Sequence, residues 1–280
     1  MSNLLNKTFT IVTPNYNMGQ YLAETIESVL INLKPGDEYF IIDGASNDGS
    51  VEIIKKYKKH ITGWVSEQDS CYAEALKKGF TLGSNDYQCW INSGDLLLPN
   101  ALQLARQALD EDSVDFIFGD DLHIDEQGNI LNVSSGKVNS LKMVMAVGGW
   151  TPLQDACFWK TKLYNKVGGL NVNKKYAADY DLFLRMSLAG NCEYNPNLYS
   201  AFRRHDGQTS HKHKKQYDFE RYQSRSEAIT KLNFNFTIFY LLKIYFWFHL
   251  RIRARFFSTN KKLKSFKGEK VSDIVCQTTL

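Results

Sequence analysis

Several common sequence features are missing from this 280-residue chain. Its five cysteines are scattered and none forms a CxxC pair, so neither a disulfide framework nor a zinc site is predicted, and a reducing compartment is the natural setting. The glycine-rich motifs GxGxxG and GxxxxGK[ST] are absent, which leaves dinucleotide and P-loop nucleotide binding without support. No uncharged apolar stretch of about 20 residues occurs, so no membrane span is expected. The first nine residues lack the pattern of a signal peptide, and a cytoplasmic protein is expected.

Charge is unevenly distributed along the chain. The net charge is +4, but residues 203–262 contain 14 Lys and Arg against 4 Asp and Glu. This predicts an acidic or balanced globular domain over residues 1–210 and a basic helical tail over residues 211–280. Within the tail, residues 234–257 combine aromatic bulk with basic charge, which suits an interfacial helix on an anionic membrane surface. A helix packed on the globular domain is the alternative. No RNA-binding motif accompanies the tail, so no nucleic-acid partner is expected.

Apolar strand-like and helical patterns alternate through the first half of the chain. Strands are predicted at residues 8–12, 39–42, 64–67 and 87–92, with helices at 21–31, 51–59 and 72–80 between them. Pro14 is expected to end the first strand, and Gly79 or Gly83 the third helix. A helix at 101–109, a strand at 114–120 and a hairpin turn at 127–129 follow. The alternation predicts an α/β fold with a mostly parallel sheet and helices on both faces.

Acidic residues recur where the predicted strands end. Asp43 follows the second strand, Asp69 lies just after the third, and Asp95 closes the turn after the fourth. Any one of them is explained by a helix cap or a turn. Their recurrence is explained better by a ligand crevice at the carboxyl edge of an open α/β sheet.

Four segments carry a family resemblance. They are TPNYN at residues 13–17, IDGASNDGS at 42–50, SEQD at 66–69 and NSGD at 92–95. Their order and spacing resemble inverting glycosyltransferases of family 2, which have the GT-A fold, and the resemblance covers roughly residues 8–205. It implies a Rossmann-like sheet and a nucleotide-sugar donor, with UDP as the expected nucleotide.

The resemblance also implies roles for individual residues. The nucleotide-sugar contacts would come from Pro14 and Tyr16 against the base, Asp43 accepting a hydrogen bond from it, Asp69 near the base or ribose, Lys78 facing the phosphates, and Asn92 and Ser93. Asp95 takes the position of the metal-binding acid, and the cation would be Mg²⁺ or Mn²⁺, held by one carboxylate together with phosphate oxygens and water. Gly94 replaces the acid that commonly contacts the ribose, which leaves that contact to Ser93 or a backbone group.

A second centre lies in ADYDLFLR at residues 178–185, which resembles the family's catalytic helix. Asp179 matches the general base, and an N-cap is its alternative. Asp181 is expected to pair with Arg185 on the same helix face. Further on, His205 is the candidate that approaches the metal or diphosphate. Arg203 and Arg204 are candidate phosphate contacts, against the alternative of a solvated basic loop.

These residues together predict a metal-dependent inverting glycosyltransferase. It would move a single sugar from a nucleotide sugar to a glycan or lipid-linked glycan acceptor in bacterial-type surface polysaccharide synthesis, at the inner face of the plasma membrane. The segments of processive synthases are absent, which favours single-residue transfer. The alternative is a catalytically inactive nucleotide- or glycan-binding protein with the same fold, which Gly94 motivates.

Overall fold

The computed structural model describes residues 7–138, 140–141, 145, 151–205, 208, 212–231 and 269–272. Strands and helices alternate through its first part, as the sequence patterns predict. The elements are β1 (Phe9–Asn15), α1 (Gly19–Leu30), β2 (Glu38–Asp43), α2 (Ser50–Tyr57), β3 (Gly63–Ser66), α3 (Tyr72–Leu82) and β4 (Tyr87–Trp90).

The second part departs from simple alternation. It contains β5 (Leu96–Leu97), α4 (Ala101–Leu109), β6 (Phe116–Ile124), β7 (Ile130–Ser134), a short 3-10 helix η1 (Gln154–Ala156), β8 (Cys157–Lys160), α6 (Thr161–Lys166), α7 (Ala178–Ala189), β9 (Cys192–Arg203) and α9 (Lys214–Lys231). The helix at 101–109 is confirmed at both ends, and the predicted hairpin turn joins β6 to β7.

One mixed sheet organises the molecule. Its strand order is β3-β2-β1-β4-β8-β6-β9-β5, and β7 pairs with β6. The first four strands in this order are all parallel, which confirms the α/β prediction for the N-terminal half. Strand β8 is antiparallel to both of its neighbours, and β5 is antiparallel to β9. The carboxyl ends of β1 to β4 therefore meet at one edge of the sheet.

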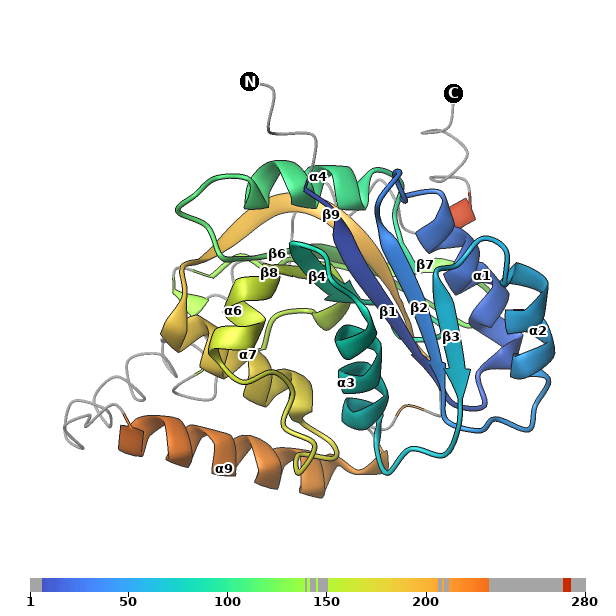
Figure 1. Ribbon diagram of the computed structural model, residues 1–280. Helices are drawn as coiled ribbons and strands as arrows, with labels where there is room; N and C mark the ends of the chain where they lie inside the picture. The colour runs from blue at the N-terminus through green and yellow to red at the C-terminus, as the bar shows by residue number, and fades with distance from the viewer. Residues whose placement is uncertain are drawn as a thin grey trace.

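Helices cover both faces of this sheet (Figure 1). Strand side chains alternate between the faces: Phe9 and Ile11 pack with α1, α2 and α4, whereas Val12 packs with α3. The α7 face is built on a cluster of aromatic rings. Trp90 lies 5.3 Å from Trp159 and 5.6 Å from Phe183 between ring centroids. This cluster fixes α7 against the sheet, and α9 packs on α7 from outside (Figure 1).

One predicted end was wrong, and another is confirmed in one of its two alternatives. Strand β1 continues through Pro14, which pairs in register with Ile42. The Pro14 carbonyl faces the β4 side and accepts the Ser93 amide there, at 3.4 Å; since β4 has ended at Trp90, the missing N–H of Pro14 breaks no ladder bond. Helix α3 ends at Leu82 with Gly83 as its C-cap, one of the two glycines predicted to end it, whereas Gly79 lies inside the helix. A Cβ at position 79 would come within 2.5 Å of the Val12 side chain. Glycine here lets the helix lie close on the strand.

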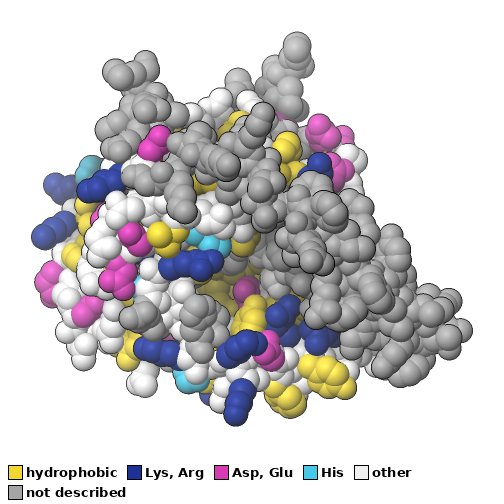
Figure 2. Space-filling view, turned by 180° about the vertical axis from the view of Figure 1, so that it is seen from behind, with side chains coloured by type: hydrophobic (Ala, Val, Ile, Leu, Met, Phe, Trp, Pro, Cys, Tyr) yellow, Lys and Arg dark blue, Asp and Glu magenta, His cyan; other side chains and the backbone are white. Residues whose placement is uncertain are grey.

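The membrane prediction is not tested by the described residues. No helix in the described ranges is long and apolar enough to span a bilayer. The predicted interfacial segment at 234–257 lies outside those ranges. The face opposite to that of Figure 1 is hollowed among its described side chains, with hydrophobic and acidic groups in the hollow and Lys and Arg side chains beside it (Figure 2).

Candidate active site

The sheet places the predicted nucleotide-binding residues along one edge. In register, Asn15 at the end of β1 pairs with Asp43 at the end of β2, and Asp43 pairs with Ser66 at the end of β3. The turn at 92–95 follows β4 at the same edge. Residues far apart in the sequence are brought together here because all four strands are parallel.

Asp43 is the centre of the hydrogen bonding at this edge. Its side chain is completely buried. It accepts hydrogen bonds from Asn15 Nδ2 at 2.6 Å, from Ser46 Oγ at 2.6 Å and from Ser66 Oγ at 2.7 Å. The carboxylate thus ties three strand ends together. Its contact with a base stays a prediction, and that contact requires one of these donors to move aside.

Tyr16 and Asp69 flank an open position beside Asp43. The Tyr16 side chain is 67% exposed, which leaves its ring available for stacking. A Cβ on Gly44 would lie 3.2 Å from Tyr16 Cδ2 and 3.6 Å from Asp69 Oδ2, so the glycine keeps the space between them open. Asp69 Oδ2 is buried without a hydrogen-bond partner, and burial raises the pKa of this carboxyl. This oxygen can therefore accept a hydrogen bond from a ligand.

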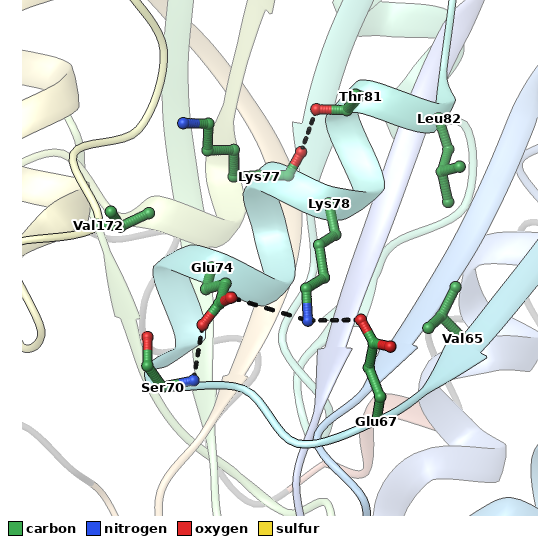
Figure 3. A pocket seen from close by; sticks show the side chains of 9 residues that line it. All are labelled: Val65, Glu67, Ser70, Glu74, Lys77, Lys78, Thr81, Leu82 and Val172. Atoms are coloured by element: carbon green, nitrogen blue, oxygen red, sulfur yellow. Dashed lines mark hydrogen bonds and ion pairs between the residues drawn. The ribbon is translucent and has the colours of Figure 1, made fainter.

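Lys78 lies among acidic side chains. Its Nζ is 2.6 Å from Asp69 Oδ1 and 2.8 Å from Glu67 Oε1, and Glu74 stands on its other side at 3.9 Å. The ion pairs of Lys78 with Glu67 and Glu74 line a cavity of about 580 Å³ between α3, the end of β3 and Val172 (Figure 3). Hydrogen bonds to Asp69 and Glu67 raise the pKa of Lys78. Its phosphate role stays a prediction, and Lys78 would have to exchange these partners to fill it.

The turn that carries Asp95 has a backbone conformation that disfavours an acid at position 94. Gly94 has φ of +110°, a conformation that side-chain-bearing residues rarely adopt. Its N–H donates to Thr25 Oγ1 at 2.9 Å, and Thr25 Oγ1 donates to the Asp95 carbonyl at 2.9 Å. Ser93 Oγ donates to the Pro14 carbonyl, while Asn92 Nδ2 donates to Gln154 Oε1 at 2.6 Å. Asn92 and Ser93, both predicted to contact the nucleotide sugar, are therefore hydrogen-bonded to other parts of the protein in this turn.

Arg203 holds this turn from the opposite side. Its side chain is 1% exposed. Its backbone N–H donates to Asp95 Oδ1 at 3.0 Å, its Nε donates to the Gly94 carbonyl at 2.9 Å, and its guanidinium lies over the Tyr21 ring. The guanidinium of Arg203, which was predicted to contact phosphate, is thus directed at protein groups. His205, two residues on, lies with its ring centroid 6.2 Å from that of Tyr21, at the same turn.

A group of buried carboxylates lies behind Asp95, and sequence reasoning missed it. Asp121 on β6 and Asp155 in η1 are both buried, and three of their four carboxyl oxygens have no hydrogen-bond partner. His123 Nε2 approaches Asp121 at 3.4 Å. Burial and the charge of Asp155 raise the pKa of Asp95, and burial followed by the charge of Asp121 raises the pKa of Asp155 to about 7. The predicted metal acid is therefore one of three crowded carboxylates.

Protein stability should fall as pH rises through this group's titration. An unfolded Asp155 ionises near pH 4, but the folded one near pH 7. Between these values the native state keeps a proton that the unfolded state has lost, so the free energy of unfolding decreases, by at most about 4 kcal/mol. Asp155→Asn should flatten the decline and raise the Tm at pH 8. Thermal denaturation of both proteins from pH 4.5 to 8.5 measures this; parallel curves would contradict it.

The described residues fit a hard cation at Asp95. They bring no three His, Cys, Asp or Glu side chains together as a metal site by themselves. Asp121 and Asp155 nevertheless place carboxyl oxygens without a hydrogen-bond partner beside Asp95. Carboxylate oxygens are the ligands that Mg²⁺ and Mn²⁺ prefer. Asp95 would hold such an ion together with oxygens of the substrate.

Asp179 lies in the first turn of α7, where the helix's free N–H groups gather. The helix is capped at Ala177, so the N-cap alternative for Asp179 is wrong. The Tyr72 hydroxyl accepts the Asp179 amide at 3.1 Å and donates to Asp179 Oδ1 at 3.4 Å. Burial raises the pKa of this carboxyl, against the lowering effects of the Tyr180 amide and the Arg221 charge. The predicted Asp181–Arg185 pair is confirmed, at 2.6 Å.

Comparison with known proteins identifies the class. The mixed sheet and the polar residues at its strand ends define a GT-A glycosyltransferase fold, which the chain shares with two solved structures. S. aureus TarS in complex with UDP-GlcNAc has a TM-score of 0.55 at 15% identity, over 72% of this chain and 60% of TarS 1–349. The mannosyltransferase PcManGT from Pyrobaculum calidifontis, in complex with GDP-Man and Mn²⁺, has a TM-score of 0.59 at 14% identity, over 80% of this chain and 64% of that one.

The chain belongs to glycosyltransferase family 2. The family description "Glycosyl transferase family 2" matches residues 10–162. An uncharacterised glycosyltransferase of Rickettsia typhi is 25% identical over 74% of this chain and 67% of its own length. The putative teichuronic acid biosynthesis glycosyltransferase TuaG of Bacillus subtilis is 29% identical over 39% of this chain and 44% of TuaG. The chain thus spans less than two thirds of TuaG and of the TarS fragment.

Proposed function

We propose that this protein transfers a single sugar from a UDP-linked donor to a glycan or lipid-linked glycan acceptor, with inversion. The observation that carries the proposal is that two carboxylate centres are built on neighbouring elements. Asp95 lies in the turn that follows β4, and Asp179 lies in the first turn of α7, which packs on β4 with the Phe183 ring centroid 5.6 Å from that of Trp90. One centre suits a cation and a leaving diphosphate, and the other suits a general base.

Asp179 supplies the base in this proposal. An acceptor hydroxyl donates a hydrogen bond to its carboxylate, and the proton passes to Asp179 as the oxygen attacks the anomeric carbon. Burial raises the pKa of Asp179 and so strengthens it as a base, while Tyr72 and Arg221 favour its ionised form. A bound divalent cation would supply charge stabilisation for the leaving diphosphate. A single displacement of this kind inverts the configuration at the sugar.

Several observations support the choice of donor and setting. The exposed Tyr16 ring and the unpartnered Asp69 Oδ2 offer stacking and a hydrogen-bond acceptor to a base or ribose. TarS is known in complex with UDP and with UDP-GlcNAc. TuaG and an Escherichia coli chondroitin synthase, 24% identical over 65% of this chain and 26% of the synthase, suggest a polysaccharide acceptor. Synthesis at the inner face of the plasma membrane is part of the proposal.

Gly94 no longer favours the inactive alternative. The acid missing at this position motivated it, but the positive φ of Gly94 gives a conformational reason for the glycine that does not depend on activity. Tight nucleotide binding without turnover on any donor remains the outcome that would establish it.

A nucleotide-sugar screen tests the proposal. UDP-sugars with Mn²⁺ should raise the Tm, because a ligand present at 100 times its Kd stabilises the native state by about 2.7 kcal/mol. GDP-sugars serve as the matched control for the base, and EDTA should abolish both the shift and the release of UDP. Turnover that persists in EDTA would contradict the metal dependence, and a shift with GDP-sugars alone would contradict the UDP assignment.

A further inference from the structure

Helix α9 supplies a hydrogen-bond acceptor to the backbone that leads into α7. Ala177 stands at the N-cap of α7 and offers no side-chain cap, although the first N–H groups of any helix need partners from outside it. The Glu220 carboxylate on α9 accepts the backbone N–H of Lys175 at 3.0 Å, and those of Tyr176 and Ala177 at 2.8 Å each. Three consecutive backbone amides before Ala178 therefore donate to the Glu220 side chain.

Other α9 contacts fix the same region. Arg221 lies 4.6 Å above the Tyr180 ring, and Lys174, which is buried, reaches Glu227 at 3.2 Å. The amide of Asp179, two residues after Ala177, is bound by the Tyr72 hydroxyl from α3. The backbone that carries Asp179 is thus held on one side by α3 and on the other by α9. Figure 1 shows α9 running beneath α3 and α7.

We propose that Glu220 is a positioning residue for catalysis, which sets the place and direction of the Asp179 carboxylate through the start of α7. The inference rests on the proposed role of Asp179 as general base. Glu220 acts through three backbone amides, and a negative group at a helix N-terminus is also favoured by the helix dipole. Helix α9 therefore belongs to the catalytic apparatus, although the sequence places it in a separate tail after residue 210.

This role predicts that loss of Glu220 affects the rate of the chemical step but not the binding of the donor. The donor-side residues Tyr16, Asp43 and Asp69 lie at the strand ends, and no described contact joins Glu220 to them. A base displaced by about 1 Å loses on the order of 100-fold in rate. Removing Glu220 should therefore lower kcat and leave the Kd for UDP unchanged.

The experiment compares Glu220→Ala, Glu220→Gln and Asp218→Asn in the full chain. Glu220→Ala removes all three acceptors, and we expect kcat to fall 10- to 100-fold with the KM for the donor within twofold of wild type. Glu220→Gln keeps one acceptor oxygen and should recover part of the rate. Asp218→Asn, the matched control, removes a half-exposed carboxylate from the same helix and should leave kcat unchanged. Asp218 pairs with Lys214 and Arg221, which also lie on α9.

Each outcome decides one question. All rates are measured at least 15 °C below the Tm of the least stable variant, with Asp179→Asn as reference. If Asp179→Asn is inactive but both Glu220 variants keep wild-type kcat, the positioning role is wrong and the proposed function stands. If Asp179→Asn keeps turnover, the proposed function itself fails. If Glu220→Ala does not fold, a wild-type kcat in Glu220→Gln overturns the inference, and a reduced kcat with unchanged UDP affinity supports it.

Discussion

Asp179→Asn should reduce kcat by about 10³-fold and leave the affinity for UDP unchanged. A positioned general base contributes about 10² to 10⁴ in rate, and an amide cannot take up the acceptor's proton. The substitution preserves size, and the Asn Oδ1 still accepts the Tyr72 hydroxyl and the Tyr180 amide, as Asp179 does. The fold should therefore persist. Product formation with donor and acceptor measures kcat, and titration calorimetry with UDP measures the unchanged binding.

The pH profile provides an internal check on this assignment. Because burial raises the pKa of Asp179, wild-type kcat should increase with pH through an ascending limb that lies above the ordinary titration range of an aspartate. The residual activity of Asp179→Asn should lack that limb. Asp112→Asn, which changes an exposed carboxylate after α4, is the control. An Asp179→Asn enzyme with full kcat and an unchanged ascending limb would exclude Asp179 as the base.

The sequence predicted those parts of the molecule that short-range patterns encode. Short apolar runs located β1, β2 and β4, because strands covered by helices on both faces of a sheet are buried on both sides, and the helical patterns lay between these runs. Parallel strands place all their carboxyl ends at one edge, so Asp43, Asp69 and Asp95 could be assigned to a common crevice before any contact was known. The Asp181–Arg185 pair was predictable for the same reason, since both residues lie within one helical turn.

The remaining features depend on contacts between residues distant in the sequence. Arg203 bonds the turn of Asp95 across 108 positions, and Glu220 reaches the start of α7 across more than 40. Arginines next to each other at 203 and 204 look alike in sequence, but Arg203 ends strand β9 and is buried, whereas Arg204 follows the strand and is exposed. Asp121 and Asp155 likewise become neighbours of Asp95 only when β6 and β8 join the sheet, so no local pattern marks them.

Asp95→Asn should abolish metal-dependent transfer while leaving the protein as stable as wild type or more so. Burial, and after it the charge of Asp155, make a negative charge at position 95 unfavourable and raise the pKa of Asp95. Asparagine removes that charge, and its Oδ1 still accepts the Arg203 amide. Asp95→Ala, in contrast, leaves this buried amide unpaired, at a cost of about 1–3 kcal/mol. A residue that destabilises its own fold is retained for its function.

The two substitutions together distinguish a functional acid from a structural one. If Asp95 serves the cation and diphosphate, Asp95→Asn should lose transfer by at least about 10²-fold, the scale expected for a group that stabilises transition-state charge, and its Tm at pH 8 should equal or exceed that of wild type. The Mn²⁺-dependent increase in Tm with UDP should disappear as well. Should Asp95→Asn unfold as readily as Asp95→Ala, the carboxylate would be holding the turn. Should it stay stable and turn over normally, the cation must bind elsewhere. A stable, inactive Asp95→Asn is the result that the raised pKa and the unpartnered carboxylates beside it lead us to expect.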